Sequence, residues 1–240
     1  MVSRSYGSFG RNVEAMKLDK ILIIHPSRGR PKMAADYAGK LIRHRSAPLE
    51  FRYVFSLDAD DSALPGYSQS LRECRFPHET VIGENRTAIG AVNRAAATLD
   101  NEDMVFNMSD DIDSSPGWDV RLARFVATIA NPEYLVQPVD MYNGQNVPVI
   151  QMMSSALYRR LGYVLPPCYD TMYADNDLLE SCRMLGSVFP CTGLGFEHLH
   201  PSAGRGSWDE TYARENRPEY YASGQAMLEL RRAQKYGLKL

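Results

Sequence analysis

The stretch MVFNMSDDIDSSPGW, at residues 104–118, joins a short apolar run to three aspartates and a Pro-Gly pair. The apolar run is too short for a helix and stops at Asp110, Asp111 and Asp113, which predicts a buried strand that opens into an acidic turn. Carboxylates this close repel one another, so a cation or solvent must compensate for them. Oxygen ligands at the end of a strand suit Mg²⁺ or Mn²⁺, and these cations in turn suit a diphosphate.

A structural explanation competes with the metal site. In this explanation Asp113 or Ser114 caps the helix that Pro116 begins, and the other acids lie in solvent. The stretch alone favours neither explanation, so the choice between them depends on the rest of the chain.

Composition indicates an ordinary globular protein. The chain has 240 residues, 44% of them hydrophobic and 23% charged, enough for one large α/β domain or two small ones. The net charge of −2 gives no global electrostatic case for nucleic acid, although the last ten residues are locally basic. The four cysteines show no Cys-x-x-Cys spacing, so neither a zinc site nor a disulfide framework is indicated.

The expected location follows from the apolar runs. None approaches the length of a membrane span, and residues 1–19 form a polar leader without the apolar block of a signal peptide. We therefore expect a cytoplasmic protein with no membrane span.

Apolar patterning predicts an α/β fold that begins with a βαβ unit. Residues 20–25 have the continuous β-branched character of a strand buried on both faces in a parallel sheet, and residues 51–57 supply the second strand of the unit. The loop PSRGRP, at residues 26–31, leads into a helix with these residues on its inner side: Met33, Tyr37, Leu41 and Ile42. A short β-prone piece between residues 75 and 83 and a helix carrying Ile89 and Val92 then precede the 104–118 stretch.

The second half of the chain has a mixed pattern. A helix is predicted over residues 116–129, followed by strands at 134–141 and 147–153 around an Asn-Gly turn at Asn143 and Gly144. A further helix begins near Asp175, and the last helix covers residues 222–235. The Gly- and Ser-rich stretch 202–207 is expected to stay mobile until a ligand binds.

In this order the elements resemble the glycosyltransferases of the GT-A fold, particularly the inverting family-two group. The resemblance covers roughly residues 20–201: a Ser-Arg-x-Arg-Pro loop after the first strand, an Asp after the second, an aspartate cluster before Pro-Gly-Trp, an acidic helix start and a late His. It implies an α/β fold with a mostly parallel central sheet flanked by helices. One catalytic domain would cover residues 20–240, with a nucleotide-sugar-binding half at 20–113 and an acceptor half at 114–240.

The resemblance also implies a donor site at the ends of the first two strands. The family's first loop lies near ribose and phosphate, and the acid after the second strand lies toward the base. The residues assigned to this donor site are Ser27, Arg28, Arg30, Asp58, Asp60, Arg86, Asn93 and Asp110. Surface salt bridges are the structural alternative for the arginines, and an ordinary exposed helix position is the alternative for Asn93.

The family's metal motif is Asp-x-Asp, and this chain departs from it. Alignment on Pro-Gly-Trp places Ser109 at the first Asp and Asp111 at the second. Asp111 is therefore the first candidate ligand, and Asp113 is a further one. Family members often add a late His, a role that His198 or His200 fits because an imidazole nitrogen is acceptable to manganese.

An inverting transfer also needs a base that removes the proton of the acceptor hydroxyl. Asp175 occupies the position of the family's catalytic acid, and Asp177 is the alternative. Either carboxylate could instead stabilise the start of its helix.

The resemblance thus implies an enzyme that moves a sugar from a nucleotide sugar, a UDP sugar, to a hydroxyl acceptor with Mn²⁺ or Mg²⁺. The acceptor is a saccharide or, as the runner-up, a hydroxymethylated base in DNA, for which the basic tail and Arg205, Arg214 and Arg217 are the local evidence. A non-catalytic metal-binding protein is a further alternative, but neither acidic cluster continues as an EF-hand loop.

Two other enzyme classes fit less well. Phosphatases with an Asp-x-Asp nucleophile need Thr or Val after the second Asp, and the serines near the two candidate pairs, Ser62 and Ser114, fit badly. Nucleotidyltransferases that make sugar nucleotides have a Gly-rich first loop, which this chain lacks.

Overall fold

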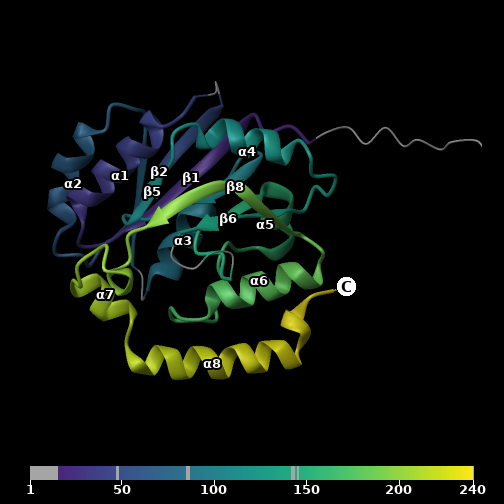
Figure 1. Ribbon diagram of the computed structural model, residues 1–240. Helices are drawn as coiled ribbons and strands as arrows, with labels where there is room; N and C mark the ends of the chain where they lie inside the picture. Colours follow the sequence, from purple (N-terminus) through teal and green to yellow (C-terminus); the bar gives the residue numbers. More distant parts are fainter. Residues whose placement is uncertain (1–15, 47–48, 85–86, 142–143, 145, 240) are drawn as a thin grey trace, which may run out of the picture.

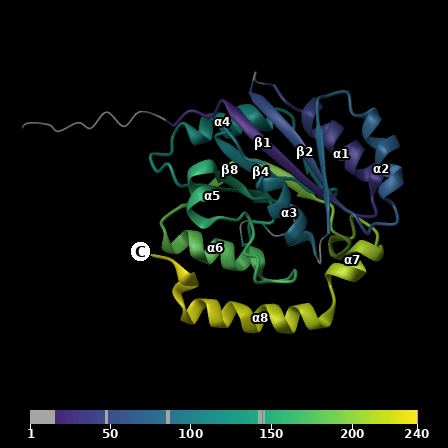
Figure 2. The same cartoon turned by 180° about the vertical axis from the view of Figure 1, so that it is seen from behind.

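The computed structural model describes residues 16–46, 49–84, 87–141, 144 and 146–239. The polar leader up to residue 15, Arg86 and Asn143 lie outside these residues, so the expectations placed on them are not addressed further. Figures 1 and 2 show a sheet with helices on both faces and the C-terminal helices beside one end of it.

Within the described part of the chain, one eight-stranded sheet has the order β3-β2-β1-β4-β7-β6-β8-β5. Strands β1 to β4 are parallel to one another, as are β6 and β8, whereas β7 and β5 run antiparallel to their neighbours. The predicted mostly parallel α/β sheet is thus confirmed. The strands are β1 (Lys20–Ser27), β2 (Glu50–Asp58), β3 (Glu79–Gly83), β4 (Met104–Asn107), β5 (Ile112–Ser114), β6 (Leu135–Asp140), β7 (Met152–Ser154) and β8 (Val188–His198).

The helices divide between the two faces and the far end of the sheet. They are α1 (Pro31–Arg43), α2 (Leu64–Ser70), α3 (Ala88–Ala96), α4 (Trp118–Val126), α5 (Ser155–Leu161), α6 (Ala174–Met184), α7 (Glu210–Glu215) and α8 (Pro218–Ala233). Short 3₁₀ turns cover Leu71–Glu73, Pro201–Ala203 and Lys235–Gly237. No helix of the described chain is both long and apolar enough to cross a membrane.

Strand β1 is apolar at consecutive positions because both of its faces are covered. Ile21 and Ile23 pack with residues of α1 and α4 in one hydrophobic cluster. Leu22 and Ile24 pack with residues of α3 in the other. The central strand is therefore held from two sides, which fixes where its carboxyl end lies.

Three details differ from the sequence expectations. Met33 is 37% exposed, because the inner face of α1 is instead made by small alanines and Leu41. The predicted strand at 147–153 shrinks to β7, and the backbone before it is irregular around Pro148, which has no N–H for a ladder. The last helix begins at Pro218, a residue suited to a first helical position, and the short α7 before it was not predicted.

The C-terminal segment returns to the start of the chain. Helix α7 lies at the carboxyl ends of β1 and β2, and α8 runs along the outside of α6 (Figures 1 and 2). This return brings residues more than 170 positions apart into one site.

Candidate active site

A cavity of about 770 Å³ opens where β1, β2 and β8 end and α6 begins. The predicted site residues that line it are Ser27, Arg28, Arg30, Asp58, Asp110, Asp175, His198 and His200. They come from both halves of the chain, so the fold gathers most of the predicted donor, metal and base candidates around one space. Five predicted site residues are not among the described residues that line it: Asp60, Asn93, Asp111, Asp113 and Asp177.

Asp111 forms a polar corner beside the cavity: it is not itself among the lining residues, but it contacts three residues that are, His198, Ser109 and Tyr212. Asp111 Oδ2 lies 3.4 Å from His198 Nε2, and Asp140 lies 3.6 Å from the other ring nitrogen. Ser109 and Tyr212 donate hydrogen bonds to the two oxygens of Asp111. Burial opposes ionisation, but His198, Ser109 and Tyr212 together hold the pKa of Asp111 well below its usual range. Burial likewise opposes protonation of His198, yet Asp111 and Asp140 raise its pKa to about 9.

This corner fits a hard divalent cation only in part. Among the described residues, no group of three or more His, Cys, Asp or Glu side chains is placed to hold a metal ion. A carboxylate and an imidazole are nevertheless acceptable ligands for Mn²⁺, and Mg²⁺ or Mn²⁺ commonly takes its remaining ligands from water and substrate phosphates. Asp111 and His198 therefore fit a cation that a diphosphate helps to bind.

The other two metal candidates lie differently. Asp113 forms an ion pair with Lys40 of α1 and is not next to His198 in the described contacts. His200 lines the cavity with its ring 5.2 Å from that of His198, and its Nδ1 accepts from the Ser202 backbone N–H at 3.1 Å. Burial, followed by the charge of His198, lowers the pKa of His200.

The donor-loop arginines are both paired with acids. Arg28 donates to Asp58 at 2.9 Å and to Asp60 at 2.6 Å. Arg30 makes a two-bonded contact with Asp209, at 2.6 and 2.7 Å, and lies 4.3 Å from the centre of the Tyr212 ring. Both arginines line the cavity, but their partners Asp60 and Asp209 do not and are at least partly exposed, so both arginines reach the cavity while making the ion pairs that the structural alternative expected.

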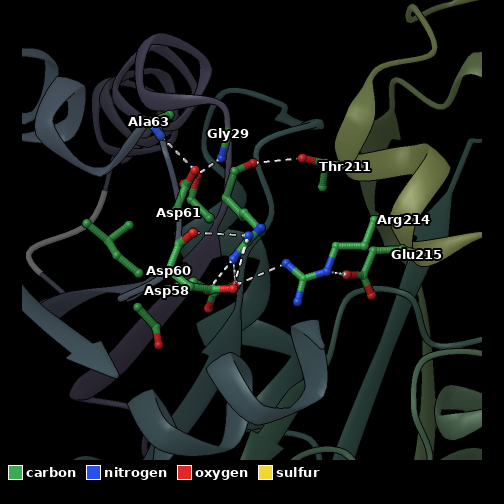
Figure 3. A network of polar contacts seen from close by, with 12 residues as sticks. Gly29, Asp58, Asp60, Asp61, Ala63, Thr211, Arg214 and Glu215 are labelled. Atoms are coloured by element: carbon green, nitrogen blue, oxygen red, sulfur yellow. Dashed lines mark hydrogen bonds and ion pairs between the residues drawn. The ribbon is translucent and has the colours of Figure 1, made fainter. Parts of the chain in front are cut away.

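Figure 3 shows how α7 is joined to the loop after β1. The Thr211 hydroxyl donates to the Arg28 carbonyl at 2.9 Å, and Arg214 lies 3.5 Å from Asp58. Asp61 accepts from the backbone N–H of Gly29 at 2.7 Å, which supports a turn whose φ of +71° suits glycine. The short helix thus closes one side of the cavity.

Asn93 has a structural position. Its side chain donates to the Leu165 carbonyl at 2.7 Å and accepts from the N–H of Val164 at 3.0 Å. These bonds fix the segment that follows α5 to helix α3. The exposed helix position proposed as its alternative is also not observed, because the side chain is partly buried.

Asp175 and Asp177 lie in the first turn of the same helix and point to different surroundings. Asp175 lines the cavity, and burial raises its pKa against the hydrogen bond that it accepts from the Asn176 N–H at 2.9 Å. Asp177 is fully buried and accepts from Arg231 at 2.8 Å and from Tyr169 at 2.9 Å. An α-helix turns through about 200° over two residues, so positions i and i+2 lie on nearly opposite faces of the helix.

Helix α8 presses against the residues just before Asp175. A methyl group added at Gly224 would stand 2.5 Å from the Met172 carbonyl oxygen, so only glycine permits this approach. Tyr173, which follows, has a φ of +71° at the start of α6. The wall of the cavity at the start of α6 therefore takes its shape from the close packing of α8.

Several site residues had no clear sequence signal. One of them lies in strand β1, and the others lie in or just before α7, far in sequence from the acidic turn. They are His25 in β1, and Trp208, Asp209, Tyr212 and Glu215 around α7. A strand histidine that directly follows four apolar residues is the one feature that singles out His25. The others lack a spacing that relates them to the acidic turn.

Comparison with known proteins finds likeness only in structure. No protein-family model and no curated protein matches the chain. A mannosyltransferase from Pyrobaculum calidifontis, solved with GDP-Man and Mn²⁺, matches with a TM-score of 0.60 and 17% identity over 91% of this chain and 76% of that one. TarS from S. aureus, residues 1–349 with UDP-GlcNAc, gives a TM-score of 0.61 and 13% identity over 88% and 66%.

A third match is a Drosophila galactosyltransferase mutant, solved with manganese, UDP-Gal and xylobiose. Its TM-score is 0.54, with 11% identity over 83% of this chain and 81% of that one. At these identities the likeness concerns the fold. It confirms that the chain has the GT-A type of glycosyltransferase fold that the sequence resemblance implied.

Proposed function

We propose that the chain is a metal-dependent, inverting glycosyltransferase that moves a sugar from a UDP sugar to a saccharide hydroxyl. The observation that carries the proposal is that one cavity is lined by an imidazole with a carboxylate directly beside it, by two donor-loop arginines and by a separate half-buried carboxylate. The structural neighbours lend support, since all three complexes contain a nucleotide sugar. Two of them also contain manganese.

The donor side would receive the nucleotide and its diphosphate. Arg28 and Arg30 supply the guanidinium groups that recognise phosphate oxygens most strongly. Asp58, at the end of β2, offers a carboxylate acceptor to an N–H of the base, in keeping with uracil. Asp111 and His198 would hold the cation, which when bound stabilises negative charge on the leaving diphosphate.

The acceptor side would supply the base. The Asp175 carboxylate takes the proton of the acceptor hydroxyl while that oxygen forms its bond to the anomeric carbon. The bond from that carbon to the diphosphate oxygen breaks on the opposite side, and its electron pair leaves with the diphosphate. A single displacement of this kind inverts the anomeric centre. The raised pKa of Asp175 makes its carboxylate a stronger base than an ordinary aspartate.

No specific observation favours DNA as the acceptor. The basic residues of the tail are engaged within the molecule, because Arg231 binds Asp177 and Arg232 binds Glu180. Arg205 pairs with Glu197, and Arg217 lies 5.8 Å from the centre of the Tyr220 ring. A saccharide acceptor remains the better-supported choice.

The test is a panel of nucleotide sugars, with and without MnCl₂ and with a set of saccharide acceptors. We expect release of the nucleoside diphosphate from a UDP sugar that requires both the cation and an acceptor. NMR of the product should show the anomeric configuration opposite to that of the donor. Absence of nucleotide binding across the panel would refute the proposal, and a retained configuration would refute its inverting mechanism.

A further inference from the structure

A group of buried polar side chains lies behind the donor loop. His25 and Tyr53 are fully buried, and Ser27, Tyr67 and Asp110 are each no more than 5% exposed. Strands β1 and β2, helix α2 and the turn after β4 each contribute to this group. Polar groups with so little exposed surface need hydrogen-bond partners within the protein, because few water molecules can reach them.

The group forms one continuous chain of hydrogen bonds. Tyr53 Oη lies 2.6 Å from His25 Nδ1, and His25 Nε2 lies 2.9 Å from Asp110 Oδ1. The other oxygen of Asp110 accepts from Ser27 Oγ at 2.8 Å. Ser27 Oγ is in turn 2.6 Å from Tyr67 Oη.

The donors and acceptors along this series of hydrogen bonds can be assigned in one consistent way. Ser27 gives its only hydroxyl hydrogen to Asp110, so it accepts from Tyr67. With a hydrogen on Nε2, His25 donates to Asp110, and its Nδ1 is left to accept from the Tyr53 hydroxyl. Every donor therefore points toward Asp110, whose carboxylate accepts from both arms.

The hydrogen-bonded group touches the donor site at two points, Arg30 and Asp110. The backbone N–H of Arg30 donates to Tyr67 Oη at 3.1 Å, which ties the donor loop to one arm. Asp110 directly precedes Asp111, the proposed cation ligand, so the second arm sets the acidic turn. His25 itself does not belong to the described lining of the cavity, and it reaches the site only through Asp110.

We propose that His25 is a positioning residue of the donor site, which through Asp110 fixes the donor loop and the acidic turn relative to each other. The inference rests on the proposed function and adds a residue to it. Partners of this kind typically change ligand affinity without touching the ligand, as they do behind metal sites.

The test compares His25→Leu with His25→Gln in the full chain. Leucine removes both hydrogen bonds, whereas glutamine keeps an N–H donor for Asp110. The measurement is the dissociation constant of UDP, and separately of GDP, in the presence of MnCl₂ by titration calorimetry. We expect His25→Leu to weaken binding by about 10- to 100-fold, the range usual for such supporting residues, and His25→Gln to restore most of it.

Ser154→Ala supplies the matched control for stability. Ser154 is 2% exposed and accepts from the N–H groups of Tyr134 and Leu157, away from the cavity. Loss of the Ser154 hydroxyl should lower the unfolding temperature, while the dissociation constants of UDP and GDP stay at their wild-type values. If His25→Leu behaves in the same way, His25 is merely structural and the inference is wrong.

Two further outcomes are decisive. If His25→Leu does not fold, Tyr53→Phe replaces it, because this variant removes only the outer bond of the chain, to His25. A smaller but measurable loss of affinity then supports the inference, and an unchanged dissociation constant overturns it. Failure of the wild-type protein to bind either nucleotide with MnCl₂ refutes the proposed function itself, and that result is recognised before any variant is made.

Discussion

The two sides of the cavity are built in contrasting ways. The donor side contains charges that are already paired: Arg28 with Asp58 and Asp60, and Arg30 with Asp209. The acceptor side, at the start of α6 and along α8, is lined by neutral side chains around one carboxylate. These neutral residues are Met172, Tyr173, Asn176 and Tyr221, and the carboxylate is Asp175.

This contrast indicates two kinds of recognition. A highly charged ligand needs counter-charges that are held in place before it arrives, and the ion pairs of the donor side hold the two arginines in this way. When the ligand binds, the arginines must exchange some of their carboxylate partners for phosphate oxygens. A neutral sugar needs shape and hydrogen bonds, and a lone carboxylate among neutral groups can then act on a proton. The expectations below test the contrast, from the largest effect on catalysis to the smallest.

Asp111→Asn should have the largest effect, because it weakens cation binding in both the ground state and the transition state. We expect turnover to fall by about 10³-fold or more, corresponding to the several kcal/mol that a bound cation supplies, and donor affinity to fall as well. Steady-state kinetics and calorimetry with MnCl₂ measure the two losses. Asp113→Asn is the matched control, since Asp113 pairs with Lys40, and an equal loss there would place the cation elsewhere.

Asp175→Asn should separate the two sides of the cavity. Donor affinity should stay near the wild-type value, whereas kcat should fall by about 10²- to 10⁴-fold, the usual contribution of a general base. Single-turnover kinetics at saturating donor isolate this step. A variant that keeps full transfer activity would mean that the helix acid only stabilises its helix.

The rate should also depend on pH in one direction. Asp175 acts when deprotonated and its pKa is raised by burial, so activity is lost as pH falls through that pKa. The decline should begin above the range of an ordinary aspartate and approach about tenfold per pH unit. The measurement is kcat against pH at saturating substrates. A decline at the ordinary aspartate range would contradict the role of burial.

Asp209→Asn should have a smaller effect, of opposite sign. It removes a charge that competes with phosphate for Arg30, yet asparagine still caps α7 through the bond from the Tyr212 N–H. We expect donor affinity to rise by up to about fivefold, because the carboxylate is partly exposed and such pairs contribute about 1 kcal/mol or less. Glu210→Gln, on the exposed first turn of α7, is the control. Weaker donor binding in Asp209→Asn would show that the pair supports the site.

Asp177→Asn should leave the rate unchanged. Asp177 is bound by Arg231 away from the cavity, so its loss should lower stability by about 3 kcal/mol, as expected when a buried pair loses one partner. Denaturant unfolding measures this change, and kcat at a permissive temperature shows whether activity persists. A large fall in kcat with Asp175→Asn unaffected would move the base to Asp177.

Periodic signals in the sequence sufficed for the sheet and the longer helices. The strand before His25 and the helix after Pro31 were predictable because burial on two faces, or on one, leaves a distinct apolar pattern. The six-residue helix α7 has no buried residue, so it leaves no such pattern. Its position depends on contacts with a loop about 180 residues earlier.

The candidate site was predictable where chemistry is concentrated in short motifs. The acidic turn, the arginine loop and the late histidines could be read in this way, and the structure brings most of them around one cavity. The side chains that bind each of these acids could not be predicted from the sequence. Arg231 binds Asp177 from 54 positions away, and His25 binds Asp110 from 85 positions away, and neither separation leaves a local signal.

The glycine contact between α8 and Met172 has a consequence for how the protein is made. Synthesis proceeds from the N-terminus, so the strands of the donor half emerge first and can begin to pair. The acceptor wall needs Gly224 against Met172 and Arg231 against Asp177, so it is complete only after those late residues have been added. A nascent chain therefore contains the arginine loop and the acidic turn of the proposed donor site well before the wall of the proposed acceptor site is complete.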